Sequence, residues 1–163
     1  MVELDNEKTI KRLKEMLLPV MAEAFKEQAE TTNYTKYSFE ERFTYIVNKE
    51  YDSRVNHTIE RNIKNAKFYD STANLNDVNY KPDRNLDKGL IESLRTNDYI
   101  RNGLNIILIG ASGSGKTWLS CAFGTNACLS KMKVRYIRMP ELFSEFEAKR
   151  IQGNYRQYLN QLF

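Results

Sequence analysis

The sequence holds little that could bind a transition metal or form a disulfide. Its 163 residues include two cysteines, Cys121 and Cys128, and one histidine, His57. The cysteines lie seven residues apart in a predicted helix, so they share a face of that helix but cannot easily bond with each other. No zinc-ligand spacing is present. We interpret both cysteines as small buried apolar residues and expect a reducing compartment, the cytoplasm.

Long apolar runs are also absent. No stretch approaches the ~20 apolar residues that a membrane-spanning helix requires, and no signal-like segment opens the chain. We therefore expect no membrane partner. With 41% hydrophobic and 28% charged residues, the composition is typical of a globular protein. The net charge of +4 is compatible with an anionic partner but does not by itself indicate one.

The N-terminal part of the chain is predicted to be helical. Apolar residues recur at helical spacing over residues 6–30, where Pro19 should kink the helix or split it in two. Ser38 followed by Glu41 fits the capping box that starts a second helix. A third helical pattern covers residues 53–67. The pattern predicts a small helical module.

We expect three segments along the chain. Residues 1–69 form the helical module. Residues 70–85 are rich in Asn, Asp and Ser and lack periodicity, which is typical of a linker. Residues 86–163 form a second domain, which contains the strand and helix patterns described next.

Four basic residues belong to the third helical pattern, and they are Arg54, Arg61, Lys64 and Lys67. One interpretation is a surface that contacts the phosphates of DNA. The other is a solvated helix face with no ligand. The residues alone leave both interpretations open.

The hydrophobic pattern changes in the second domain. Residues 104–109 form an almost continuous apolar run, which is typical of a strand buried on both faces of a parallel sheet. Residues 118–130 read as a helix and residues 134–139 as a second strand. Pro140 then fits the first turn of another helix. This alternation predicts an α/β fold, in which the helical module precedes the first part of a parallel-sheet domain.

A phosphate-binding motif lies between the first strand and its helix. The residues Gly110, Ala111, Ser112, Gly113, Ser114, Gly115, Lys116 and Thr117 match G-x-x-x-x-G-K-[ST] at every position. The glycines allow the backbone N–H groups to turn inward around a phosphate, and the positive end of the following helix faces the same anion. Lys116 is expected to reach the β and γ phosphates, and Thr117 to place its hydroxyl on Mg²⁺. The motif therefore predicts binding of ATP or ADP with Mg²⁺.

Hydrolysis of the bound nucleotide requires further groups. Enzymes with this loop use a strand that ends in acidic residues, together with a cation that stabilises the transition state. No apolar run after residue 117 ends in such an acidic pair. We therefore expect the 163 residues to bind nucleotide without hydrolysing it.

Several stretches together resemble the IstB-like ATP-binding proteins, which are helper ATPases of insertion sequences and relatives of the DnaC helicase loaders. "LKEMLLPVMAEAFKEQ" (residues 13–28) is similar to the opening helix of the family, and "SFEERFTYIVNKEYDSR" (38–54) to its second element. "NIILIGASGSGKTWLSCAFGTNA" (105–127) is similar to the family's phosphate loop, with Trp118 where histidine is usual. "VRYIRMPELF" (134–143) fits its second strand and the helix that follows.

The resemblance implies an AAA+ core, ATP binding, and action on DNA beside a transposase. Residues 110–117 are the only positions whose binding role carries over from the family. The acidic pair, sensors and arginine finger of the family have no counterpart here, so the resemblance implies a truncated AAA+ domain. The truncation in turn predicts self-association through uncovered apolar surface.

Other functions stay open at this point. A helicase loader acting on single-stranded DNA would share the same fold and loop. A small-molecule kinase would share the loop, although no lid-like arginine cluster follows it. A non-enzymatic interaction fragment with a vestigial loop would bind no nucleotide.

Overall fold

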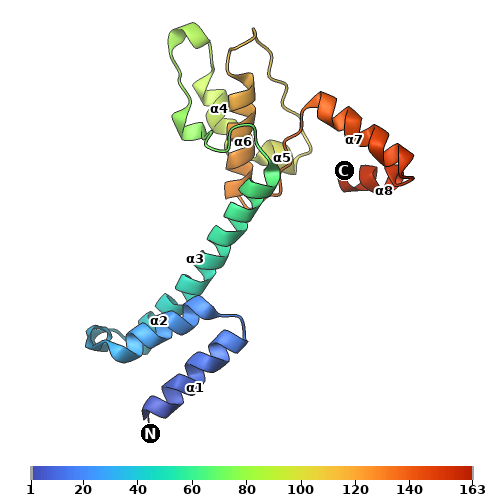
Figure 1. Cartoon of the computed structure of the whole chain (residues 1–163). Coiled ribbons are helices and arrows are strands. Elements are labelled where there is room, and N and C mark those ends of the chain that lie inside the picture. The colour runs from blue at the N-terminus through green and yellow to red at the C-terminus, as the bar shows by residue number, and fades with distance from the viewer. Residues whose placement is uncertain (1, 163) are drawn as a thin grey trace. The chain divides into compact units, whose positions relative to one another are not determined.

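The computed structural model describes residues 2–162. Figure 1 shows that its regular elements are helices connected by turns and irregular segments. The first elements are α1 (Val2–Glu15), α2 (Pro19–Glu30), η1 (Thr32–Lys36) and α3 (Phe39–Ala66). Next come η2 (Leu75–Asp77), η3 (Pro82–Arg84), α4 (Lys88–Leu94) and α5 (Asp98–Arg101). The last are α6 (Lys116–Leu129), α7 (Met139–Ile151) and α8 (Tyr155–Leu162). The η elements are 3₁₀ turns.

The prediction of an α/β fold with a parallel sheet is wrong for this chain. Residues 2–162 contain no strand, and segments 104–109 and 134–138 have no regular structure. Ile107 and Ile109, expected inside a sheet, are 80% and 91% exposed. An apolar run shows that a segment could be buried, but a strand forms only when a neighbouring strand accepts and donates its backbone hydrogen bonds. Among the described residues neither segment has such a neighbour.

The residues group into two compact units, the first ending at Glu60 and the second beginning at Arg61. In the first unit, α1 and α2 lie side by side (Figure 1). The predicted split at Pro19 is confirmed, because Pro19 occupies the first turn of α2 and Leu17 adopts a left-handed backbone with φ of 60°. Proline has no N–H and its ring clashes within a helix, but it suits a helix start.

The predicted capping box at the start of α3 is also confirmed. The Ser38 hydroxyl oxygen accepts from the Glu41 N–H at 3.2 Å, and the Glu41 carboxylate accepts from the Ser38 N–H at 2.8 Å. The following helix is longer than the sequence pattern indicates. It continues without a break through residues 48–52, where two separate helices are expected.

Glu50 is a buried carboxylate that links two helices of the first unit. Its carboxylate is buried, accepts from the Met21 N–H at 2.9 Å and pairs with Arg54 at 2.7 Å. Burial by itself raises the pKa of this carboxyl, but the hydrogen bonds from Arg54 and Met21 outweigh burial and lower the pKa overall. The ionised carboxylate therefore ties the start of α2 to the middle of α3.

The core of the second unit forms around α6. Buried apolar side chains from the segment before α4, from α4 and from α6 make one cluster. Its members are Ala73, Leu75, Val78, Ile91, Leu119, Cys121, Ala122 and Phe123. Phe68, Tyr80, Leu86 and Trp118 pack around that cluster. The chain after α3 thus packs around α6, the helix that follows the glycine-rich motif. This helix is the most buried helix of the unit.

Within the second unit, α7 and α8 are joined by a turn at Gly153, where φ is 73°. Tyr158 of α8 is buried, and its ring packs edge-on against the Phe146 ring, with 5.9 Å between the two ring centroids. The Tyr158 hydroxyl donates to the Glu145 carboxylate, which also pairs with Arg135.

Among residues 2–162, no helix combines the length and the apolar composition that a membrane span requires.

Candidate functional site

The glycine-rich loop (residues 110–117) leads directly into α6. Gly113 and Gly115 adopt the left-handed backbone, with φ of 75° and 89°, which side-chain-bearing residues rarely adopt. Gly115 is the N-cap of α6, and no side chain caps this helix end. The N–H groups of the first turn and the positive end of the helix dipole are therefore left for an anion.

Lys116 folds back over the loop. Its ammonium donates to the carbonyl oxygens of Gly110 and Ala111, at 2.9 and 2.6 Å. Space around the loop is also tight, because a Cβ on Gly110 would lie 3.0 Å from the Ser114 hydroxyl oxygen. The Lys116 ammonium is thus hydrogen-bonded to the backbone at the start of the loop.

Two cavities flank the loop and share Lys116. The Thr117 cavity has a volume of about 520 Å³ and is lined by residues that include Tyr99, Asn105, Thr117 and Ser120. The Thr117 side chain is exposed, so its hydroxyl is accessible to a ligand or ion.

The Arg84 cavity also adjoins the loop and has a volume of about 560 Å³. It is lined by Arg84, Leu86, Lys116 and Leu119 and by parts of segments 107–111 and 114–115. Arg84 donates from Nη2 to the Ser114 carbonyl oxygen at 3.0 Å. The sequence did not indicate Arg84 as a site residue, because it lies in the predicted linker and belongs to no motif. The only local signal is the turn chemistry of Pro82 before it and Asn85 after it.

A buried polar network fixes the position of α6. Asn97 is fully buried and donates to the Ser130 hydroxyl oxygen at 2.9 Å. The Asn126 amide donates to the Asn97 side-chain oxygen at 3.1 Å and to the Arg95 carbonyl at 2.9 Å. These bonds tie the turn between α4 and α5 to the end of α6, so the loop at the other end begins from a fixed helix.

The four predicted DNA-contact residues are divided between the two units. Arg54 lies in the first unit, where it pairs with Glu50 and donates to the Leu17 carbonyl. Arg61, Lys64 and Lys67 lie in the second unit with exposed side chains. Arg61 and Lys64 are on the last turns of α3, and Lys67 follows the helix with φ of 55°. Part of the positive charge of Arg54 is therefore already balanced.

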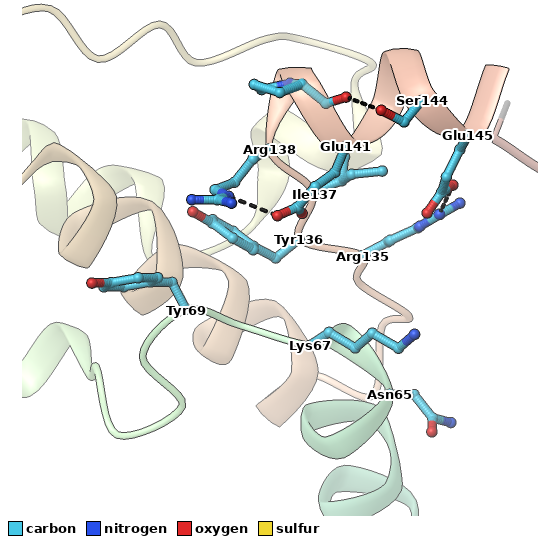
Figure 2. Close-up of a pocket in the computed structure, with 11 residues that line it drawn as sticks. Asn65, Lys67, Tyr69, Arg135, Tyr136, Ile137, Arg138, Glu141, Ser144 and Glu145 are labelled. Atoms are coloured by element: carbon cyan, nitrogen blue, oxygen red, sulfur yellow. Dashed lines mark hydrogen bonds and ion pairs between the residues drawn. The ribbon is translucent and has the colours of Figure 1, made fainter. Parts of the chain in front are cut away.

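A third cavity, the Arg138 cavity, lies in the second unit and has a volume of about 1030 Å³. Figure 2 shows its two arginines beside carboxylates, with Arg138 directed at Glu141 and Arg135 at Glu145. The Arg138–Glu141 hydrogen bond is 2.8 Å long. Lys67 lines the same cavity. Because both arginines have acidic partners, this cavity attracts an anion less strongly than a cavity with unpaired cations.

The two cysteines are buried free thiols, as the sequence predicts. Burial raises the pKa of Cys128, so this thiol stays protonated and inert. Within the described part of the chain, no cluster of three His, Cys, Asp or Glu side chains is placed to hold a metal ion.

Comparison with known proteins finds similarity to one ATP-binding family. A family model described as IstB-like ATP binding protein matches residues 11–163. One relative, named as an ATP-binding protein of an insertion sequence in Pseudomonas fluorescens, is 34% identical over 154 residues, 94% of this chain and 67% of that protein. A similarly named relative in Sinorhizobium fredii is 32% identical over 147 residues, 90% of this chain and 60% of the relative. Another in Geobacillus stearothermophilus is 27% identical, over 87% of this chain and 56% of the relative. The chain thus spans between 56% and 67% of the length of these relatives.

Proposed function

Since this chain belongs to the family of IstB-like ATP-binding proteins, we propose that it binds ATP and ADP with Mg²⁺ through the glycine-rich loop. The observation that carries the proposal is the complete phosphate-binding motif at the uncapped start of α6. The backbone N–H groups of the loop and the helix dipole would face the phosphates. A nucleotide fits these residues, because the loop combines two left-handed glycines with an ammonium and an uncapped helix end.

Lys116 and Thr117 have separate roles in this proposal. Lys116 would exchange the carbonyls of Gly110 and Ala111 for phosphate oxygens, which are charged and accept stronger hydrogen bonds. The exposed Thr117 hydroxyl would hold Mg²⁺, which supplies positive charge between the β and γ phosphates.

Isothermal titration calorimetry with ATP and ADP tests the proposal. Lys116→Ala is expected to weaken binding roughly 10- to 100-fold, because one charge-assisted hydrogen bond contributes about 1.5–3 kcal/mol. The matched control is Lys133→Ala, which removes an exposed lysine that lines neither loop cavity. Thr117→Val should weaken binding in the presence of Mg²⁺ more than in its absence. Equal affinities for Lys116→Ala and the wild type would refute the proposal.

We further propose that the chain binds without hydrolysing ATP. None of the described residues that line the two loop cavities is an Asp or Glu, so no carboxylate there could orient a water molecule. Groups of this kind supply a factor of ~10² or more in rate. Phosphate release from the 163-residue chain should therefore equal that of Lys116→Ala. Turnover that depends on Lys116 would show that a catalytic acid reaches the loop.

The biological role that we propose is that of a helper in DNA transposition, acting beside a transposase in a reducing cytoplasm. The names of the relatives, which refer to insertion sequences, support this role. The alternative is a DnaC-like helicase loader. Pull-down of the tagged chain against a purified transposase and against a replicative helicase separates the two. Binding to the helicase alone would refute the transposition role, and a chain that binds either protein but no nucleotide would be an interaction module.

DNA contact is proposed for Arg54, Arg61, Lys64 and Lys67. The exposed side chains of the last three support it, and the ion pair of Arg54 leads us to expect the smallest effect at that position. Alanine at each of the other three positions should weaken binding at low salt and lower its salt dependence. Fluorescence anisotropy with a labelled duplex measures this, with Lys8→Ala on α1 as the charge-matched control. If none of the four substitutions changes the affinity for DNA, these residues form a solvated helix face without a DNA contact.

Self-association is the remaining proposal about partners. Exposed apolar side chains such as Ile107, Ile109 and Ile151 support it, since they are 80%, 91% and 88% exposed. Sedimentation velocity at several protein concentrations should show a mass that rises with concentration. A constant monomer mass would refute the proposal.

A further inference from the structure

We propose that Arg84 is a second cation of the nucleotide site and binds a phosphate oxygen of the nucleotide together with Lys116. The inference rests on the proposed nucleotide binding by the glycine-rich loop. It adds a residue outside that motif, in the segment that the sequence alone indicates to be a linker.

The position of Arg84 relative to the loop is the first observation. Its Nη2 donates to the Ser114 carbonyl oxygen at 3.0 Å. A Cβ on Gly115 would lie 2.9 Å from the same nitrogen. The guanidinium therefore occupies the space that a side chain at position 115 would need, directly beside the start of α6.

The chain around Arg84 fixes the backbone from which the guanidinium extends. Pro82 starts η3, and Asn85 ends it with a left-handed φ of 48°. The Arg84 N–H donates to the Lys81 carbonyl at 3.0 Å, so the backbone of the turn is hydrogen-bonded. Leu86, two residues later, packs against the core cluster around α6. The turn and this anchor place the Cα of Arg84 within reach of the loop.

The charges around the Arg84 cavity are the second observation. Arg84 and Lys116 line one cavity, and no Asp or Glu is among its described lining residues. The arginines of the Arg138 cavity, by contrast, pair with Glu141 and Glu145. Two cations that share a cavity repel each other, and an anion between them removes the repulsion.

The chemistry of the guanidinium suits a phosphate. It carries five N–H donors in one plane, of which one is used on the Ser114 carbonyl. The remaining donors can bind phosphate oxygens in pairs, which a single ammonium cannot do. Arg84 would thus add a fixed, planar contact to the one made by Lys116.

A purely structural role would also explain the bond to Ser114, so the test must separate the two. Glutamine can still donate from its amide to a backbone carbonyl, but it carries no charge. Lysine keeps the charge and loses the planar fork. A phosphate contact therefore predicts that Arg84→Lys retains more affinity than Arg84→Gln, whereas a structural bond predicts that Arg84→Gln retains wild-type affinity.

Calorimetry of the 163-residue chain with ATP and ADP is the experiment. We expect Arg84→Gln to weaken binding about tenfold or more, because it removes a charge-assisted contact, and Arg84→Lys to have an intermediate effect. The weakening should shrink at high salt, where charge interactions are screened. Lys81→Gln, which removes an exposed charge from the same turn outside the cavity lining, is the matched control and should stay within about twofold of the wild type.

The outcomes separate this inference from the function on which it rests. Wild-type binding that requires Lys116 but is unchanged by Arg84→Gln overturns the role of Arg84 alone. Equal weakening by Arg84→Gln and Arg84→Lys, together with lower melting temperatures, also overturns it, because both variants would then have damaged the loop. No binding by the wild type overturns both proposals.

Discussion

Replacing Asn97 by alanine should destabilise the second unit selectively. Asn97 is fully buried, and its side chain bonds to Ser130 and Asn126. Its backbone adopts a left-handed conformation with φ of 61°, which asparagine tolerates better than alanine. The substitution therefore removes two hydrogen bonds and adds backbone strain at the turn that holds α6.

The expected cost follows from these contacts. The left-handed backbone costs about 1 kcal/mol for alanine, and a buried amide that loses a partner costs roughly 1–3 kcal/mol. The Asn126 amide keeps the Arg95 carbonyl as a second acceptor, which favours the lower part of that range. We expect a total loss of about 2–3 kcal/mol in the free energy of unfolding. Asn97→Gly removes the same hydrogen bonds without the backbone strain and should lose about 1 kcal/mol less.

Trp118 makes this measurement specific to the second unit. It is the only tryptophan of the chain, and it packs against the core cluster around α6. Its fluorescence in urea titrations therefore reports unfolding of that unit, while circular dichroism reports the helices of both. A free energy of unfolding for Asn97→Ala within about 0.5 kcal/mol of the wild type would refute the reasoning. Equal losses for Asn97→Ala and Asn97→Gly would refute the contribution of the backbone.

Three further substitutions test other contacts. The lowered pKa of Glu50 means that its stabilising contribution is complete above the unfolded carboxyl pKa and is lost as the pH falls through the folded pKa; Glu50→Gln should flatten this acid dependence of the free energy of unfolding, measured by circular dichroism. Gly124→Ala places a Cβ 2.4 Å from the Phe68 ring, so a net loss of roughly 1 kcal/mol or more is expected after the helix-propensity gain; an unchanged melting temperature contradicts it. Tyr158→Phe removes the hydroxyl bond to Glu145 and should cost about 1 kcal/mol, with faster hydrogen exchange confined to α7 and α8.

Local features of the chain could be predicted from the sequence because the residues that cause them are neighbours. Pro19 splits the first helical pattern, and Ser38 caps α3 through Glu41 three residues away. The motif that ends in Thr117 predicts the turn and helix start that the structure contains. Each of these outcomes depends on a few backbone torsions and on hydrogen bonds within one turn, so the sequence by itself determined them.

Contacts between distant residues were decided only by the tertiary structure. A strand needs a partner from elsewhere in the chain, and the apolar run 104–109 has none among the described residues, so the predicted sheet is absent. Arg84 reaches Ser114 across 30 positions because the segment before α4 wraps the core around α6. No periodicity or motif encodes such an approach, since it depends on how side chains far apart in sequence pack together in space.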